Sequence, residues 1–250
     1  YLAKNIKMTI QSKGKRPVGR TITRLSLQSK IVLTMTLFLL TLGTVGFYLL
    51  EHHNPATMGT LNAAGKFQAA FFQSVTTRTA GFASISQSGL TNGSKLLACM
   101  LMIVGGSPAG TAGGIKTTTV AVLLLTAISV LRGNKDTECY GRKITFEIIR
   151  VAITITLVTF VFWLFGVTVM TVIEPQQKVL DLMFEATSAM ATVGLTVDLT
   201  PVLSDISHVV LMLMMYIGRI GPMTMALIFS GHVDKKNKFR TLPEAKIMVG

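Results

Sequence analysis

Charged residues are scarce in this chain, and acidic residues are the scarcest. Only 14% of the 250 residues are charged and only 11 are Asp or Glu, whereas about 25% of an average soluble domain is charged. The acids form no pair of facing carboxylates, and no Ser/His/Asp set accompanies them; Asp181 and Glu185 simply lie one turn apart on one predicted helix. We therefore expect neither an ordinary soluble domain nor an enzyme active site.

The chain has only two cysteines. Cys99 falls in an apolar run and Cys139 in a basic segment, so we expect two reduced thiols and no disulfide. The adjacent histidines His52 and His53 have no cysteine or carboxylate set beside them, and such sets are what transition metals require. We therefore predict no transition-metal site and no bound cofactor.

Long uncharged apolar runs are the feature that the chain does have. Half of its residues are hydrophobic, and its mean hydropathy is +0.56. Residues 31–50 and 151–173 carry no charge over 20 and 23 residues, and about 20 apolar residues cross a bilayer as a helix. Two such runs would be exceptional in one short soluble chain, so we predict an all-α, multi-pass integral membrane protein.

The basic residues gather in three clusters beside these spans. A net charge of +13 would suit nucleic acid, but no aromatic residues interleave the C-terminal basic tail as a stacking surface requires. Segments 51–94 and 174–207 hold only Lys66, Arg78 and Lys178, so the positive-inside rule places these two segments outside and the clusters in the cytoplasm. The clusters are Lys4, Lys7, Lys13, Lys15, Arg16, Arg20, Arg24 and Lys30; Arg132, Lys135, Arg142, Lys143 and Arg150; and Lys235, Lys236, Lys238, Arg240 and Lys246.

Two stretches of the chain match each other in a register that pairs Thr79 with Thr192 and Gly81 with Gly194; we call this pairing the repeat register. Residues 67–84 read FQAAFFQSVTTRTAGFAS, and residues 180–197 read LDLMFEATSAMATVGLTV. Each runs from a helix-like segment into Thr-x-Gly and lies between apolar runs, which fits a re-entrant hairpin whose extended part lines protein or water. We predict two repeats of span, re-entrant pore helix and span, each resembling a potassium-channel subunit.

The Thr-x-Gly segments are the candidate selectivity filter. A dehydrated potassium ion needs a shell of oxygens, which consecutive carbonyls supply when glycine allows the required backbone angles. The negative C-terminal ends of the two short helices favour a cation at the same place. Arg78 is expected to brace the hairpin, because a cation beside the ion path would repel the ion. The predicted ion-binding residues are Thr79, Ala80, Gly81, Phe82, Thr192, Val193, Gly194 and Leu195.

Residues 105–114 interrupt the second apolar stretch with five glycines and a proline, and such a segment is no stable helix. We predict a flexible plug below the filter. Arg219 lies within the last span, 206–231, which also has an interruption at 218–222, and its guanidinium suits the plug's carbonyls. Lys116 either helps to close the pore or marks the inner membrane side. The predicted gate residues are Gly105, Gly106, Ser107, Gly110, Gly113, Gly114, Lys116 and Arg219.

These predictions divide the chain into five parts. The parts are a cytoplasmic connector at 1–30, a first pore repeat at 31–131, a cytoplasmic linker at 132–150, a second pore repeat at 151–231 and a cytoplasmic tail at 232–250.

Four motifs, in this order, resemble the membrane subunit of the Ktr/Trk/HKT potassium transporters, closest to the bacterial KtrB type. They are TTRTAGF, GGSPAGTAGGIKTTT, ATVGLT and IGRIGPMTMALIF, within about residues 25–250. The resemblance implies potassium uptake across a bacterial cell membrane through one pore made of four repeats. It makes Gly81 and Gly194 the filter glycines of the third and fourth repeats, residues 105–114 the intramembrane gate, and Arg219 the residue that helps to hold the gate shut.

The resemblance also implies partners and a longer chain. It implies a homodimer, a cytoplasmic nucleotide-binding regulatory ring of the KtrA type, and potassium, with or without sodium, as the transported ion. Because a pore needs four repeats and the chain begins at Tyr1, we expect the C-terminal half of a longer protein, which does not conduct alone. Two other interpretations are a two-repeat cation channel subunit that forms a pore by oligomerising, and a non-conducting membrane scaffold.

Overall fold

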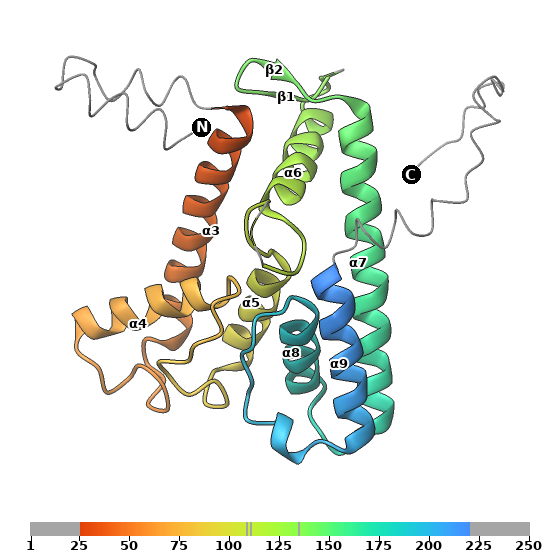
Figure 1. The fold of residues 1–250 in the computed structure, drawn as a ribbon. Helices are drawn as coiled ribbons and strands as arrows, with labels where there is room; N and C mark the ends of the chain where they lie inside the picture. The colour runs from red at the N-terminus through yellow and green to blue at the C-terminus, as the bar shows by residue number, and fades with distance from the viewer. Residues whose placement is uncertain (1–25, 109, 111, 135, 221–250) are drawn as a thin grey trace, which may run out of the picture.

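The computed structural model describes residues 26–220 except residues 109, 111 and 135. Within this part the chain is helical apart from one two-stranded hairpin, as Figure 1 shows. The predicted helical class is therefore confirmed. Residues 1–25 of the predicted connector and the whole predicted tail, 232–250, lie outside the described residues.

The first half of the chain contains a long helix, a short helix and a helix broken into two. These are α3 (Leu27–Glu51), α4 (Ala63–Thr76), α5 (Asn92–Ile103) and α6 (Thr117–Leu131). The helix α3 starts before the predicted span because Ser26 caps it, with the Ser26 Oγ accepting from Ser29 N at 3.2 Å. Asn62 caps α4 in the same way, accepting from Gly65 N at 2.7 Å. A short helix thus lies where the re-entrant segment is predicted.

The second half follows the hairpin and also contains a long helix, a short helix and a third helix, in that order. Its elements are β1 (Glu138–Cys139), β2 (Arg142–Lys143), α7 (Phe146–Ile173), α8 (Val179–Met190), the 3-10 turn η1 (Thr200–Val202) and α9 (Asp205–Ile220). The predicted linker, 132–150, thus contains the hairpin and the start of α7. The predicted interruption at 218–222 does not begin at Gly218, since α9 continues to Ile220; residues 221 and 222 lie outside the described part.

Gly218 has a packing role in place of the predicted helix-breaking role. A Cβ at this position would overlap the carbonyl oxygen of Met190 at the end of α8. Glycine therefore lets α9 approach the end of the short helix closely while the α9 backbone remains helical.

Two helices, α3 and α7, are long and apolar enough to cross a membrane, and α5 and α6 are shorter apolar helices. Large apolar side chains on α7, such as Leu157 and Phe165, are 63% and 68% exposed, as on a lipid-facing helix. The core lies instead around α8, where Leu182 and Phe184 are fully buried. In Figure 1 α8 sits inside the bundle, and it packs against α5, α7 and α9.

In each half, a glutamate at the end of the long helix accepts hydrogen bonds from residues at the start of a later helix. Glu51 Oε1 accepts from the N and Oγ1 of Thr91, at 2.9 and 2.8 Å. Glu174 Oε1 accepts from Ser204 N and from Ser207 Oγ, both at 2.8 Å. Thr91 and Ser204 stand just before α5 and α9 and are paired by the repeat register. The correspondence between the halves therefore extends to side chains outside the matching stretches.

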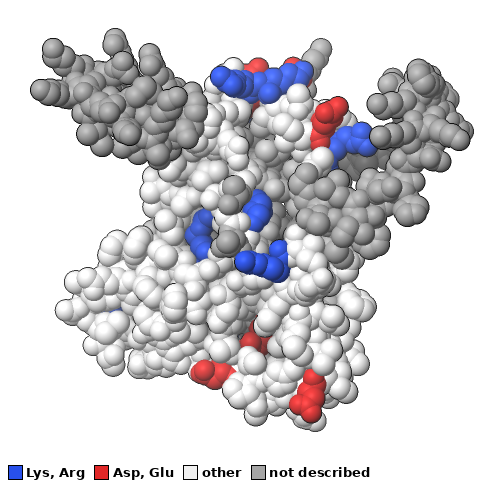
Figure 2. All heavy atoms as spheres, viewed as in Figure 1, with Lys and Arg blue, Asp and Glu red and all other residues white. Residues whose placement is uncertain are grey.

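Polar contacts also join the two halves. Lys95 Nζ on α5 lies 2.6 Å from Asp181 Oδ1 on α8, with the two side chains 8% and 21% exposed. Ser88 Oγ donates to Asp198 Oδ2 at 2.7 Å. Figure 2 shows Lys and Arg side chains, with some Asp and Glu side chains beside them, at the hairpin end of this face, while the charged side chains visible at the opposite end are acidic.

Candidate ion filter and intramembrane loop

Both Thr-x-Gly segments have the same unusual backbone. The φ angle is 66° at Thr79 and 77° at Gly81, and 52° at Thr192 and 94° at Gly194, while the residue between keeps a negative φ. A left-handed φ is costly for a β-branched residue such as threonine. Strain at the same position of both halves marks these segments as functional candidates.

The N–H groups of these segments bond back to the short helices. In the first segment, Ala80 N and Gly81 N donate to Thr76 O at 3.2 and 3.4 Å. In the second, Val193 N donates to Ser188 O at 2.9 Å and Gly194 N donates to Ser188 Oγ at 3.2 Å. Among the residues that the structure describes, no backbone N–H donates to a carbonyl of residues 79–81 or 192–194. These oxygens are therefore not used by the backbone, as a cation site made of carbonyls requires.

The fourth predicted filter position differs between the halves. Thr76 Oγ1 forms hydrogen bonds with both backbone groups of Phe82: it accepts from Phe82 N at 2.9 Å and donates to Phe82 O at 2.5 Å. The Phe82 side chain is 70% exposed, whereas Leu195 is 3% exposed. One acceptor position of the Phe82 carbonyl is thus already used, which separates Phe82 from the three residues before it.

The two glycines are constrained in different ways. A Cβ at Gly81 would overlap the carbonyl oxygen of Val193, so the two filter segments approach each other there. A Cβ at Gly194 would lie 3.9 Å from the Gly81 Cα, which is an ordinary contact. Gly81 is therefore required by both φ and space, and Gly194 by φ alone.

Buried polar side chains connect each short helix to the chain that follows its Thr-x-Gly segment, and we call each connection a brace. Gln73 and Gln87 exchange two hydrogen bonds of 2.7 and 3.1 Å, and Glu185, 4% exposed, accepts from Thr196 Oγ1 at 2.5 Å. The sequence places Glu185 on the short helix, which the structure confirms, but it does not predict these hydrogen bonds. The available signal was an acid at the C-terminal half of a short apolar helix, where the helix dipole disfavours it.

The loop 105–114 is tied at its base by backbone hydrogen bonds. Gly105 N donates to Ile115 O at 2.9 Å, Ile115 N donates to Ile103 O at 3.0 Å, and Thr117 N donates to Gly106 O at 3.2 Å. The sequence predicted a flexible plug throughout, but the base of the loop is a paired neck. Glycine fits here because the two arms pass closely: a Cβ at Gly105 would overlap the Gly113 carbonyl.

The loop 105–114 contacts residues of both candidate filter regions, Thr192 and Arg78. Gly113 N donates to Thr192 Oγ1 at 3.0 Å, and Arg78 Nη2 donates to Gly105 O at 3.4 Å. Arg78 thus contacts the loop 105–114 in addition to standing next to the first Thr-x-Gly segment, and the sequence did not predict this contact. Lys116 Nζ donates to the carbonyl of Ala112, within the loop itself.

Arg219 lies in the last turn of the described part of α9. It is an electrostatic neighbour of Lys116, and it lines a hollow of about 560 Å³ together with Thr192 and Gly194. Figure 2 shows Lys and Arg side chains around the middle of this face, between its two ends. The structure thus brings Arg219, Lys116 and the second filter segment together, while the pinning of the loop by Arg219 stays a prediction.

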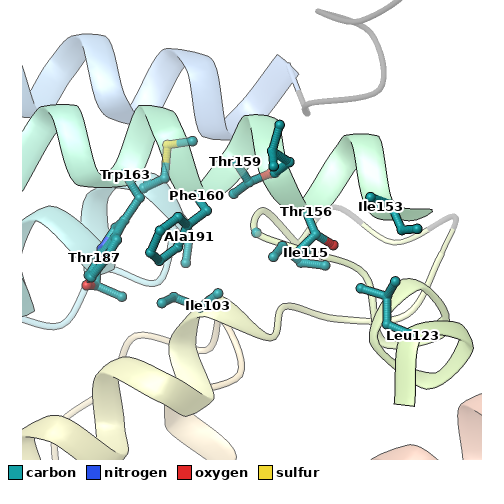
Figure 3. Close-up of a pocket in the computed structure, with 13 residues that line it drawn as sticks. Ile103, Ile115, Leu123, Ile153, Thr156, Thr159, Phe160, Trp163, Thr187 and Ala191 are labelled. Carbon is teal, nitrogen blue, oxygen red and sulfur yellow. The ribbon is translucent and has the colours of Figure 1, made fainter. Parts of the chain in front are cut away.

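A separate cavity of about 400 Å³ lies behind the loop, between α6, α7 and α8 (Figure 3). Its lining is mostly apolar, and its wall includes Trp163, whose Nε1 donates to Thr187 Oγ1 at 2.8 Å. The other lining residues are Ile103, Gly114, Ile115, Leu123, Ile153, Thr156, Leu157, Thr159, Phe160, Met190 and Ala191. No carboxylate of the described residues lines it, so the filter segments are better candidates for an ion site.

Residues 15–240 match the family described as TrkH, cation transport protein. The chain is 36% identical over 232 residues to the Ktr system potassium uptake protein B of Bacillus subtilis, covering 93% of this chain and 51% of the relative. It is 36% identical over 226 residues to the protein of the same name from Vibrio alginolyticus, covering 90% and 49%. It is 34% identical over 232 residues to the potassium/sodium uptake protein NtpJ of Enterococcus hirae, covering 92% and 51%.

The fold has a counterpart among solved structures. The potassium transporter TrkH from Vibrio parahaemolyticus superposes with a TM-score of 0.64 at 16% identity, over 81% of this chain and 44% of that chain. This likeness concerns the fold. The chain spans about half the length of the curated relatives that it matches. From the match of residues 15–240 and from the identity with these relatives, the chain belongs to the TrkH family of cation transport proteins.

Proposed function

We propose that this chain is part of a transporter that takes up potassium across the cytoplasmic membrane, and that residues 79–82 and 192–195 form part of its selectivity filter. The observation that carries the proposal is the backbone of the two Thr-x-Gly segments. Their φ angles alternate in sign, and no backbone N–H in the described part of the chain donates to their carbonyls. Carbonyls to which no backbone N–H donates can replace the hydration shell of a bare cation.

The relatives support potassium as the ion. Two of them are named as potassium uptake proteins and one as a potassium/sodium uptake protein, so sodium is the alternative or second ion. Two Thr-x-Gly segments supply two sides of a ring of carbonyls, and the longer relatives have the length for two more such units. The complete protein, with all its repeats, is therefore the conducting unit in this proposal.

The loop 105–114 is the proposed gate, and its contacts beside the two Thr-x-Gly segments support this role. Gly113 bonds to Thr192, while Arg78 bonds to Gly105. We further propose that the basic hairpin end is cytoplasmic, as the positive-inside rule predicts, and that the transporter is a homodimer. A nucleotide-binding regulatory ring of the KtrA type would dock at that end.

The test is potassium uptake by the complete protein. Cells that lack their own potassium uptake systems would express the full-length protein, and uptake of potassium and of sodium would be followed over time. We expect uptake that saturates with potassium and prefers it to sodium. A well-inserted protein that moves neither ion, alone or with its regulatory subunit, would show that the chain is a membrane scaffold.

A further inference from the structure

Glu185 is a buried carboxylate that contacts the chain just after the second filter segment. It lies on α8 and is 4% exposed. Its Oε1 accepts from Thr196 Oγ1 at 2.5 Å and from Val197 N at 3.0 Å, and its Oε2 accepts from Thr200 Oγ1 at 2.9 Å. One side chain therefore connects the short helix to three points along the chain that leaves the filter.

The first half has a brace in the corresponding place but of different chemistry. Gln73 on α4 and Gln87 beyond the filter exchange hydrogen bonds through their amides, and both are buried. In the repeat register Gln87 corresponds to Thr200, whereas Gln73 corresponds to Ala186, the neighbour of Glu185. In each half, a side chain of the short helix thus hydrogen-bonds to the chain that follows the Thr-x-Gly segment. The bonds join two neutral amides in the first half and involve Glu185 in the second.

The chemistry of the second brace gives it a specific function. The Val197 N–H can only donate, so Glu185 Oε1 serves as an acceptor in this arrangement. Three hydrogen bonds to one side chain restrict how far the segment from Thr196 to Thr200 can move. The alternation of φ in Thr192 and Gly194 needs such support, because strained backbone persists only where its surroundings hold it.

We propose that Glu185 is a positioning residue that holds the second filter segment at the width that favours potassium over sodium. Glu185 does not touch the ion in this proposal; it acts through Thr196, Val197 and Thr200 on the carbonyls before them. A filter held less firmly can contract around the smaller sodium ion, so loss of the brace lowers selectivity before it lowers uptake. The inference rests on the proposed function and adds a residue that no filter motif contains.

The experiment uses the complete protein and measures potassium uptake, sodium uptake and the competition between them. Glu185→Gln keeps the size and one acceptor oxygen but loses the charge, and we expect the preference for potassium over sodium to fall by about tenfold, since a buried donor loses a good partner. Glu185→Ala should lower it further. Thr196→Val and Thr200→Val each remove one donor, and each should have a smaller effect in the same direction.

The matched control is Glu51→Gln, which alters a fully buried carboxylate with the same kind of partners, Thr57 and Thr91, away from the filter. We expect this variant to insert less well or to be less stable but to keep its ion preference. An equal loss of preference in Glu51→Gln would overturn the proposal, because general destabilisation would then explain the effect.

Other outcomes also decide the matter. If the apparent affinities for potassium and sodium fall equally in Glu185→Gln, the preference is unchanged and Glu185 acts as a general negative charge, which overturns the positioning role. If the Glu185 variants do not insert, unchanged preference in both Thr196→Val and Thr200→Val overturns it. If the unaltered protein takes up no potassium, the proposed function itself fails. That result differs from potassium uptake by the Glu185 variants with an unchanged preference for potassium over sodium, which overturns the positioning role alone.

Discussion

Gly113 of the loop 105–114 donates its N–H to the hydroxyl of Thr192, the first residue of the second Thr-x-Gly segment, at 3.0 Å. The corresponding hydroxyl of Thr79 has no such bond to the loop within the described residues. A threonine oxygen that accepts from the loop has less capacity to accept an ion. If the proposed filter binds an ion at this oxygen, the loop competes with that ion, which would couple the proposed gate to the proposed filter.

The first prediction follows from this contact. Glycine is the only residue that fits at position 113, because a Cβ there would overlap Thr192 Oγ1 and the Ala191 carbonyl. Gly113→Ala should push the loop away from the filter and raise potassium flux several-fold, in the complete protein and without the regulatory subunit. The matched control is Gly110→Ala, since a Cβ at Gly110 would lie 3.3 Å from its nearest neighbour, Ser107 O, and should change flux little. Lower flux in well-inserted Gly113→Ala would mean that the loop belongs to the conduction path.

The second prediction concerns the filter glycines. Both have a left-handed φ, which costs a side-chained residue about 1–2 kcal/mol. Gly81→Ser and Gly194→Ser should both reduce the preference for potassium over sodium, and the Gly81 variant should also insert less well because its Cβ would overlap Val193 O. Competition uptake and membrane yield measure the two effects separately. Unchanged preference in both variants would remove these segments from the filter.

The features that the sequence predicted correctly depend on patterns among neighbouring residues. The apolar runs indicated the positions of α3 and α7, the glycines at 105–114 excluded a helix between α5 and α6, and the match of the two stretches paired Thr79 with Thr192. These features succeed because hydrophobic length and backbone freedom are properties of a few neighbouring residues. The family was predicted for the same reason, since its motifs are contiguous.

What the sequence did not predict depends on contacts between distant residues. The bond between Arg78 and Gly105 joins residues 27 apart, and the bond between Gly113 and Thr192 joins residues 79 apart. Gly218 illustrates the same difficulty, because glycine in a helix indicates a break as readily as a close approach. Only the position of Met190 against α9 shows that Gly218 allows packing.

The third prediction concerns orientation. The hairpin carries Lys143 at one end of the molecule, and the segment after α3 lies at the other end (Figure 1). Cysteines placed at Lys143 and at Thr60, both exposed, should react with an impermeant reagent from the cytoplasmic and the outer side, respectively. The native Cys99 and Cys139 are buried, so the unaltered protein is the control and should label weakly. Labelling of both new cysteines from one side would contradict the re-entrant arrangement of α4.

The fourth prediction concerns the glutamate that follows α7. Hydrogen bonds from the side chain and the backbone of Ser204, and then from Ser207, hold the pKa of Glu174 below its ordinary value of 4.5. A lowered pKa means that Glu174 stabilises the folded protein above the pKa that it has when unfolded, and that this contribution is lost as the pH falls through the lower folded value. Glu174→Gln should therefore be less stable than the unaltered protein at about pH 6, and the difference should shrink below 4.5.

Thermal unfolding in detergent measures this difference, and the fluorescence of Trp163, the one tryptophan in the chain, reports it across the pH range. His208 lies close enough to influence Glu174, so the comparison is repeated in a His208→Gln background. The loss of stability below 4.5 should persist there, because its main cause is the hydrogen bonds from Ser204. A difference between the two proteins that does not depend on pH would show that Glu174 contributes through packing, and the serines at the start of α9 would then cap that helix without the carboxylate.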